Sequence, residues 1–150
     1  MELELYPEKA PLSVANFKKL VSEGFYDGLT FHRIIEGFMI QGGDPAGNGT
    51  GGSPDTVKGE FSINGVNNDL PHEKGVVSMA RSSYNNSGSS QFFICQGEKD
   101  RISYLDGQYA AFGKLTSGYD VLDRIAALPT DENDAPLTRV VITSVSFLND

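Results

Sequence analysis

Hydrophobic and polar residues alternate along several short segments of the chain, which is the pattern of half-buried β-strands. The segment 2–6 (ELELY) alternates strictly, and residues 140–147 form a further apolar run near the end of the chain. Between them, runs separated by Gly, Asn and Ser clusters predict strands at 31–35, 38–43, 76–80, 91–95 and 110–115. The pattern therefore predicts seven short strands, two of them joined as a hairpin around Glu36-Gly37.

Two segments change to the spacing of an amphipathic helix. The first helix is predicted to begin at Ser13, an N-cap residue, and to end at Gly24, with apolar residues at positions 14, 17, 20 and 21. The second covers 119–128, with Ser117 as its cap and Pro129 after its end. Many short strands, glycine-rich turns and few helices predict a mainly β fold, a barrel or sandwich with helices at its ends.

The composition narrows the function classes. The 150 residues fit one domain, 1–150. Twenty acidic against twelve basic residues give a net charge of −8, which disfavours nucleic acid and anionic membrane as partners. No apolar run is long enough for a transmembrane helix, and no secretory signal opens the chain. A single cysteine excludes an intramolecular disulfide, so a cytoplasmic location is expected.

The sequence contains residues that resemble known catalytic or binding motifs, but their context does not support such roles. Residues 47–52 match G-x-G-x-x-G, but neither a strand before them nor a helix after them is predicted, so nucleotide binding is not expected. His32 and His72 lack metal-ligand spacing, and Cys95 lies in the apolar run FFIC, which is typical of a buried, inert thiol. We therefore expect no metal and no cofactor.

Arg33 stands out because it lies within the apolar segment FHRII. Strict alternation would place it on the same face as Phe31 and Ile35. Across the predicted hairpin it would meet two large apolar side chains and an amide, those of Phe38, Met39 and Gln41. By the same alternation, one phenylalanine of the pair 92–93 faces the core and the other adds aromatic surface. This combination predicts an apolar pocket with hydrogen-bond donors at its edge. The alternative is an exposed arginine on an open sheet face.

Several ordered motifs resemble the cyclophilins, a family of cyclosporin-binding peptidyl-prolyl cis–trans isomerases. They are FHRIIEGFMIQGGD (31–44), NGTGG (48–52), GVVSMAR (75–81), GSSQFFIC (88–95) and YLDGQYAAFGKL (104–115). The similarity runs from residue 2 to about residue 147, and its style is that of small bacterial members. It implies an antiparallel β-barrel of eight strands capped by two α-helices. The family's first strand precedes the part that matches ELELYPEKAP, so this strand is expected to be absent here, which would leave an unpaired edge.

The resemblance also implies roles for individual residues. Arg33 matches the catalytic arginine, and Gln41 matches the glutamine that binds substrate and steadies that arginine. The pocket for the substrate proline ring corresponds to Phe38, Met39, Phe93 and Leu105. Further substrate-binding positions are Ala80, Arg81 (through its backbone), Gln91, Tyr104 and Tyr109. His32 matches a histidine behind the groove and is given no role in proton transfer.

The implied partners are proline-containing peptides and unfolded protein segments, bound by a monomer that assists protein folding. Tyr104 and Tyr109 stand where many eukaryotic members have tryptophan and histidine, so we expect weakened affinity for cyclosporin. A binding module that docks a proline-bearing partner without turnover is the main alternative. Arg33 favours the enzyme, because a pure binder does not need that arginine. A carbohydrate-binding barrel is disfavoured, since the chain has no tryptophan.

Overall fold

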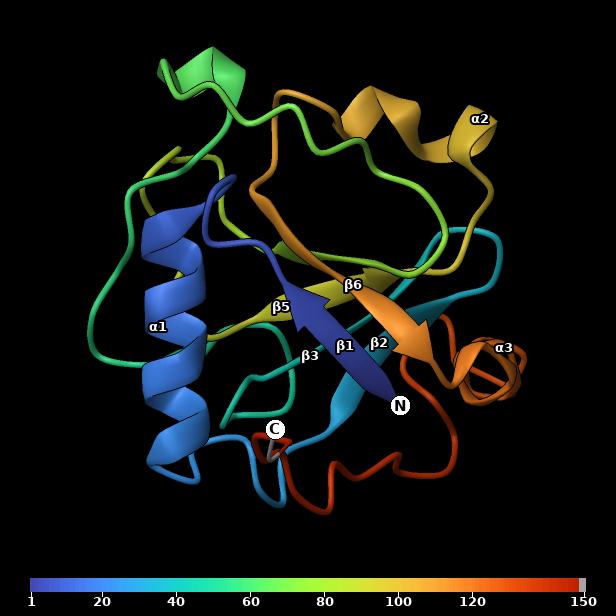
Figure 1. Ribbon diagram of the computed structural model, residues 1–150. Coiled ribbons are helices and arrows are strands. Elements are labelled where there is room, and N and C mark those ends of the chain that lie inside the picture. Colours follow the sequence, from blue (N-terminus) through green and yellow to red (C-terminus); the bar gives the residue numbers. More distant parts are fainter. Residues whose placement is uncertain (149–150) are drawn as a thin grey trace.

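The computed structural model describes residues 1–148 and contains one antiparallel sheet of six strands flanked by helices (Figure 1). The strands follow the spatial order β1-β6-β4-β5-β3-β2. Their bounds are β1 (Glu2–Leu5), β2 (Phe31–Ile35), β3 (Met39–Gly42), β4 (Val76–Met79), β5 (Phe92–Cys95) and β6 (Ala111–Ser117). The helices are α1 (Pro11–Ser22), α2 (Lys99–Ile102) and α3 (Tyr119–Ala126), with short 3-10 turns at Ser62–Asn64 and Ser103–Leu105. None of the helices within residues 1–148 has both the length and the hydrophobicity needed to cross a membrane.

Both faces of the sheet are buried, which β5 shows most simply. Phe92 and Ile94 belong to the larger core, which includes the apolar side of α1 and two residues of α3. Phe93 and Cys95 point to the other face and belong to the smaller core, with Ile102 of α2. In Figure 1, α1 lies to the left of the strands, α3 to the right and α2 at the upper right. The prediction that one phenylalanine of the 92–93 pair faces the core is confirmed.

The sheet does not close into a barrel in the part of the chain that the structure describes. β1 pairs only with β6, and β2 pairs with β3. The predicted strand 140–147 is wrong: it is reduced to an isolated bridge between Val141 and Thr30. Beyond this point the backbone N–H of Val145 donates to Asp27 Oδ1, so it is not available for pairing with a strand. The mainly β antiparallel fold is confirmed, in the form of six strands.

The helix starts differ from the sequence predictions. α1 begins at Pro11, so Ser13 lies inside its first turn and is not the N-cap. No side chain of the preceding residue caps this helix, and proline at the first position needs no N–H partner. α3 follows Gly118, whose φ of 94° belongs to the left-handed region, whereas Ser117 is the last residue of β6 and does not cap it. The four-residue α2 is additional to the two expected helices.

A β-bulge in β2 changes the direction in which its side chains point. Phe31 pairs with Gly42, but the next pair is Arg33 with Gln41, so β2 has one extra residue there. As a result Phe31 and Ile34 both enter the larger core. The expectation that Phe31 shares a face with Arg33 is therefore wrong. On the hairpin side of the bulge the register is regular and pairs Arg33 with Gln41, beside the smaller core.

Candidate active site

Three polar side chains form a hydrogen-bonded chain along one side of the site. Arg33 Nη1 donates to Gln41 Oε1 at 3.4 Å, and Gln41 Nε2 donates to Gln91 Oε1 at 2.9 Å. Gln91 Nε2 in turn donates to the carbonyl oxygens of Gly51 at 2.7 Å and Gly49 at 3.1 Å. The backbone of the glycine-rich segment 47–52 therefore anchors these three hydrogen-bonded side chains, which we call the polar chain. Its other end is the exposed guanidinium of Arg33.

The carboxylate of Asp44 shapes this glycine-rich segment. It is buried and accepts backbone N–H groups from Ala46, Asn48 and Gly49 at 2.6–3.1 Å. Burial by itself raises the pKa of Asp44, but the backbone hydrogen bonds outweigh it and the pKa is lowered. The charged carboxylate of Asp44 therefore holds this loop in place. The G-x-G-x-x-G motif at 47–52 thus has a structural role that does not involve a nucleotide.

An apolar surface lies beside the arginine. Met39, Phe93 and Leu105 are buried in the smaller core, and Phe38, Ala80 and Tyr109 are partly buried against it. The register pairs Gln41 with Phe93, so the polar chain and the apolar surface adjoin on β3 and β5. The ring of Tyr109 meets Phe93 edge-on with a centroid separation of 5.8 Å. We call this apolar surface, with the cation of Arg33 at its rim, the groove, and its apolar side chains the floor.

Two residues of the predicted site lie at its outer wall. Tyr104 is 60% exposed and its ring lies 6.3 Å from that of Phe38. The guanidinium of Arg81 lies over the rings of Phe61 and Tyr109, at 4.9 and 4.7 Å from their centroids. It also donates to the carbonyl oxygen of Gln108 from two nitrogens, at 2.8 and 3.0 Å. The Arg81 side chain therefore forms part of the outer wall of the site. The sequence prediction gave a role only to the backbone of this residue.

A polar network of buried His72 and Ser78 with the exposed Asp106 lies behind the floor. His72 stacks on Phe93 with a centroid separation of 6.2 Å. Its Nδ1 lies 2.9 Å from Asp106 Oδ1, and its Nε2 lies 2.9 Å from Ser78 Oγ. Burial lowers the pKa of His72, although Asp106 opposes this shift. Sequence reasoning missed this network; the only local signal was Ser78, a polar residue within the buried strand VVSM.

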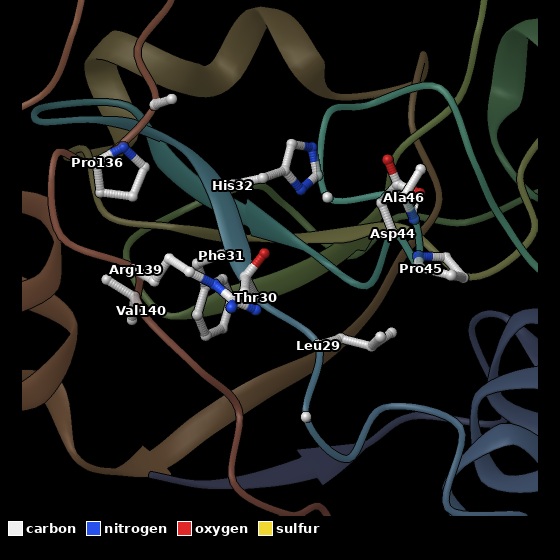
Figure 2. A pocket seen from close by; sticks show the side chains of 13 residues that line it. Leu29, Thr30, Phe31, His32, Asp44, Pro45, Ala46, Pro136, Arg139 and Val140 are labelled. Carbon is white, nitrogen blue, oxygen red and sulfur yellow. Dashed lines mark hydrogen bonds between the residues drawn. The ribbon is translucent and has the colours of Figure 1, made fainter.

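The site combines apolar side chains with hydrogen-bond donors next to them. Ser78 and His72 are almost fully buried, so their arrangement with Asp106 cannot reach a bound molecule as a nucleophile and base would. A cavity of about 320 Å³ lies elsewhere, beside His32, and has none of these groove residues in its lining (Figure 2). All eleven predicted site residues nevertheless come together on or around the smaller core.

Comparisons with known proteins identify a family to which this chain is similar. The family model described as "Cyclophilin type peptidyl-prolyl cis-trans isomerase/CLD" matches residues 1–147. "Peptidyl-prolyl cis-trans isomerase B" of Bacillus subtilis is 51% identical over 120 residues, which cover 80% of this chain and 78% of that protein. "Peptidyl-prolyl cis-trans isomerase-like 1" of Neurospora crassa is 42% identical over 149 residues, with coverage of 99% and 88%. A crystal structure of a Cryptosporidium parvum cyclophilin-type isomerase "in the presence of dipeptide ala-pro" superposes with a TM-score of 0.88 at 32% identity, covering 99% of this chain and 92% of that one.

Proposed function

The chain belongs to the cyclophilin-type peptidyl-prolyl cis–trans isomerases, and on this basis we propose that its groove binds proline-containing segments with Arg33 at the rotating bond. The single observation that carries the assignment is the placement of Arg33. The regular register of the β2–β3 hairpin pairs it with Gln41, beside the apolar floor around Phe93. The dipeptide Ala-Pro named with the Cryptosporidium structure supports the same substrate class.

The physical problem in this reaction is the loss of amide resonance. Rotation about a peptide bond faces a barrier of about 18–20 kcal/mol, because the twisted bond loses its partial double-bond character. Uncatalysed X–Pro isomerisation therefore takes on the order of tens to hundreds of seconds. No covalent bond is made or broken. In the twisted state the proline nitrogen regains a lone pair and becomes a hydrogen-bond acceptor.

Arg33 is suited to stabilise this twisted state. An arginine stays protonated and presents a planar fork of donors. A guanidinium directed at the proline nitrogen or the adjoining carbonyl binds the twisted state more strongly than either planar isomer, and this difference lowers the barrier. In our proposal Gln41 is both the positioning partner of Arg33 and a hydrogen-bonding group for the substrate. The hydrogen bonds of the polar chain would fix the orientation of the Arg33 guanidinium before substrate binds.

The apolar floor would hold the proline ring while the preceding carbonyl rotates. Phe38, Met39, Phe93 and Leu105 present apolar surface for such a ring. Ala80, Gln91, Tyr104 and Tyr109 line the groove next to it in this proposal, together with the backbone of Arg81. Assistance of protein folding, a monomeric state and a cytoplasmic location stay predictions from the sequence.

The test is the isomerisation rate of a short proline peptide. We expect Arg33→Ala to reduce turnover by about 10²–10³-fold, by analogy with removal of one preorganised oxyanion donor. Arg124→Ala is the matched control, because Arg124 is exposed on α3 and outside the groove. Equal rates for wild type and Arg33→Ala would overturn the role of Arg33. Exchange line-broadening in peptide NMR separates turnover from mere binding, which is the alternative function.

A further inference from the structure

The side chain of Arg81 has a fixed position at the outer wall of the groove. Its guanidinium lies over two aromatic rings, at 4.9 Å from the centre of Phe61 and 4.7 Å from that of Tyr109. Nε and Nη2 both donate to the carbonyl oxygen of Gln108, and Nη1 donates to that of Ser82 at 2.9 Å. Because the rings and hydrogen bonds already hold this cation, binding a ligand to it costs little further side-chain entropy.

The Arg81 guanidinium keeps two unused hydrogen-bond donors. An arginine carries one N–H on Nε and two on each terminal nitrogen. Each of these nitrogens makes one hydrogen bond within residues 1–148, so Nη1 and Nη2 each retain one N–H without an acceptor there. Donors on both terminal nitrogens of a planar cation suit the two oxygens of a carboxylate, and such charge-assisted hydrogen bonds are roughly twice as strong as neutral ones.

No carboxylate in the described part of the chain pairs with Arg81. Glu60 and Asp106 are the acidic residues closest in sequence to its ring and carbonyl partners, but both have other partners. Glu60 accepts hydrogen bonds from the start of α1, and Asp106 accepts one from the backbone N–H of His72. A small hollow next to Arg81 has Lys58 and no acidic residue in its lining. This part of the groove wall is therefore positive, although the whole molecule carries a net charge of −8.

The location of Arg81 puts its guanidinium beside the residues that flank a bound proline. Tyr109 connects it to the floor, because the same ring that lies under the guanidinium also meets Phe93 edge-on at 5.8 Å. In the proposed function the floor holds the proline ring and the backbone of Arg81 binds the substrate. Since successive Cα atoms are about 3.8 Å apart, a residue one or two positions from the proline brings its side chain within reach of the guanidinium.

We propose that the Arg81 side chain makes the groove selective for substrates with aspartate or glutamate one or two positions from the proline. This inference rests on the proposed function and names a substrate class for the same groove. The substrate carboxylate pairs with the two unused donors of Arg81, whereas a lysine at the same position is repelled. Salt screens charges more than about 8–10 Å away, so the nearby cations outweigh the distant carboxylates of the molecule.

A peptide scan tests this selectivity. Acetylated and amidated peptides with a single proline carry Glu, Gln or Lys at one of the two positions before or the two positions after the proline, with alanine elsewhere. At one or more of these positions, kcat/KM for the Glu peptide should exceed that for the Gln peptide at least about threefold, and the Lys peptide should fall below both. The Glu-to-Gln ratio should shrink as NaCl rises from about 50 mM to about 500 mM. A smaller ratio at all positions would overturn the proposal.

Variants assign the selectivity to one side chain. Arg81→Gln should bring the Glu-to-Gln ratio close to one, and Arg81→Lys, which keeps the charge without the planar fork, should keep part of it. Arg124→Gln, which removes an exposed arginine of α3 outside the groove, should keep the full ratio. General damage to the wall would slow every peptide without changing the ratio, so a full ratio in Arg81→Gln would overturn the proposal.

The proposed function and this selectivity can fail separately. Absence of turnover with every peptide would contradict the isomerase function. The dissociation constants of the same Glu and Gln peptides, measured by NMR titration, would then still give the ratio for a groove that only binds. Turnover of all peptides with equal kcat/KM for Glu and Gln would leave the function intact and overturn the role of Arg81.

Discussion

Gln91 fixes the direction in which the amide of Gln41 points. The NH₂ group of Gln91 donates to the carbonyl oxygens of Gly49 and Gly51, which leaves its Oε1 facing Gln41 at 2.9 Å. Gln41 must turn its own NH₂ toward that oxygen, so its carbonyl oxygen faces Arg33. Each hydrogen bond of the polar chain is therefore donated in the direction from Arg33 toward the loop. Neither the Gln41 amide nor the Gln91 amide can flip without breaking at least two of these hydrogen bonds.

We therefore expect Gln91→Ala to lower the turnover number about tenfold, which corresponds to about 1.4 kcal/mol of lost transition-state stabilisation. The peptide affinity of the apolar floor should change much less. Gln96→Ala is the matched control: the Gln96 amide bonds Gly37 and Asp123, outside the polar chain. Steady-state kinetics on both variants would decide the matter, and an equal loss of turnover in the two would contradict the positioning role.

Tyr104 offers a direct test of cyclosporin affinity. It is exposed at the groove wall next to Phe38, at the position where the family resemblance implies a donating tryptophan. Tyr104→Trp should strengthen inhibition of isomerase activity by cyclosporin about five- to tenfold, the value of one added hydrogen bond. Tyr104→Phe has no donor and should show no gain. Nanomolar inhibition of the wild-type protein would contradict the expected weak binding.

The two histidines make stability fall in mildly acidic solution. The pKa values of His32 and His72 are both lowered from 6.5, chiefly by burial. Below pH 6.5 the unfolded chain therefore takes up protons that the folded chain refuses. Stability is complete above that pH and falls as the pH drops, by at most about 1.4 kcal/mol per pH unit for each group.

Urea unfolding at pH 7.5 and 5.5 measures this effect. The midpoint should be lower at pH 5.5, and the double variant His32→Gln, His72→Gln should show a smaller difference between the two pH values. Asp44, whose pKa is lowered from 3.8, contributes stability that is lost only below about that value, outside this range. A midpoint that stays constant from pH 7.5 to 5.5 would show that the histidine pKa values are not depressed by folding.

Glu60 acts as a remote cap for α1. Its carboxylate is buried and accepts the backbone N–H groups of Leu12 and Ser13, at 3.1 and 2.6 Å, and the hydroxyl of Ser13 at 2.7 Å. Because hydrogen bonds to charged groups contribute about 1.5–3 kcal/mol and unsatisfied donors are costly, Glu60→Ala should lower the free energy of unfolding by about 2–3 kcal/mol. Chemical denaturation would measure this, with the exposed Glu8→Ala as a control that leaves the midpoint nearly unchanged.

Cys95 should be inert in the folded protein. Burial raises the pKa of this thiol to about 12, and its side chain is inaccessible. Since the thiolate is the reactive form, an aromatic disulfide reagent such as DTNB should react only after unfolding. One equivalent of released thiolate in urea, and none in buffer, is the expected result. Rapid labelling of the native protein would contradict the burial of this residue.

Local patterns were sufficient to predict most of the sheet. Six of the seven predicted strands are present, because each depends on apolar residues that face a core within the same short segment. The strand predicted at 140–147 is wrong although its composition fits a strand. Residues 140–142 share backbone hydrogen bonds with residues 28–31, but the pairing does not continue, and the backbone N–H of Val145 donates to the Asp27 side chain instead. Only Val141 forms a bridge there, with Thr30.

The site residues came from motifs, whereas their support came from contacts between distant parts of the chain. Nothing near Arg33 in the sequence shows the bulge that turns Phe31 to the opposite face of β2. Glu60 caps a helix that begins 49 positions earlier at Pro11, so no local capping rule could find it. The His72 network likewise joins residues from separate segments. Such features depend on tertiary structure, and sequence periodicity does not encode them.

The free edge of β1 has a consequence for how the molecule behaves in crowded solution. Among the described residues this strand pairs on one side only, with β6, and a further strand can pair with its other side. Leu3 and Leu5 pack against the larger core, while Glu2 and Glu4 are exposed. Any pairing of two such strands that keeps the leucines inward brings glutamates face to face, and like charges opposite one another are unfavourable. The alternation that marks this segment as a strand therefore also limits edge-to-edge growth into fibres, and replacing both glutamates by threonine would remove that protection.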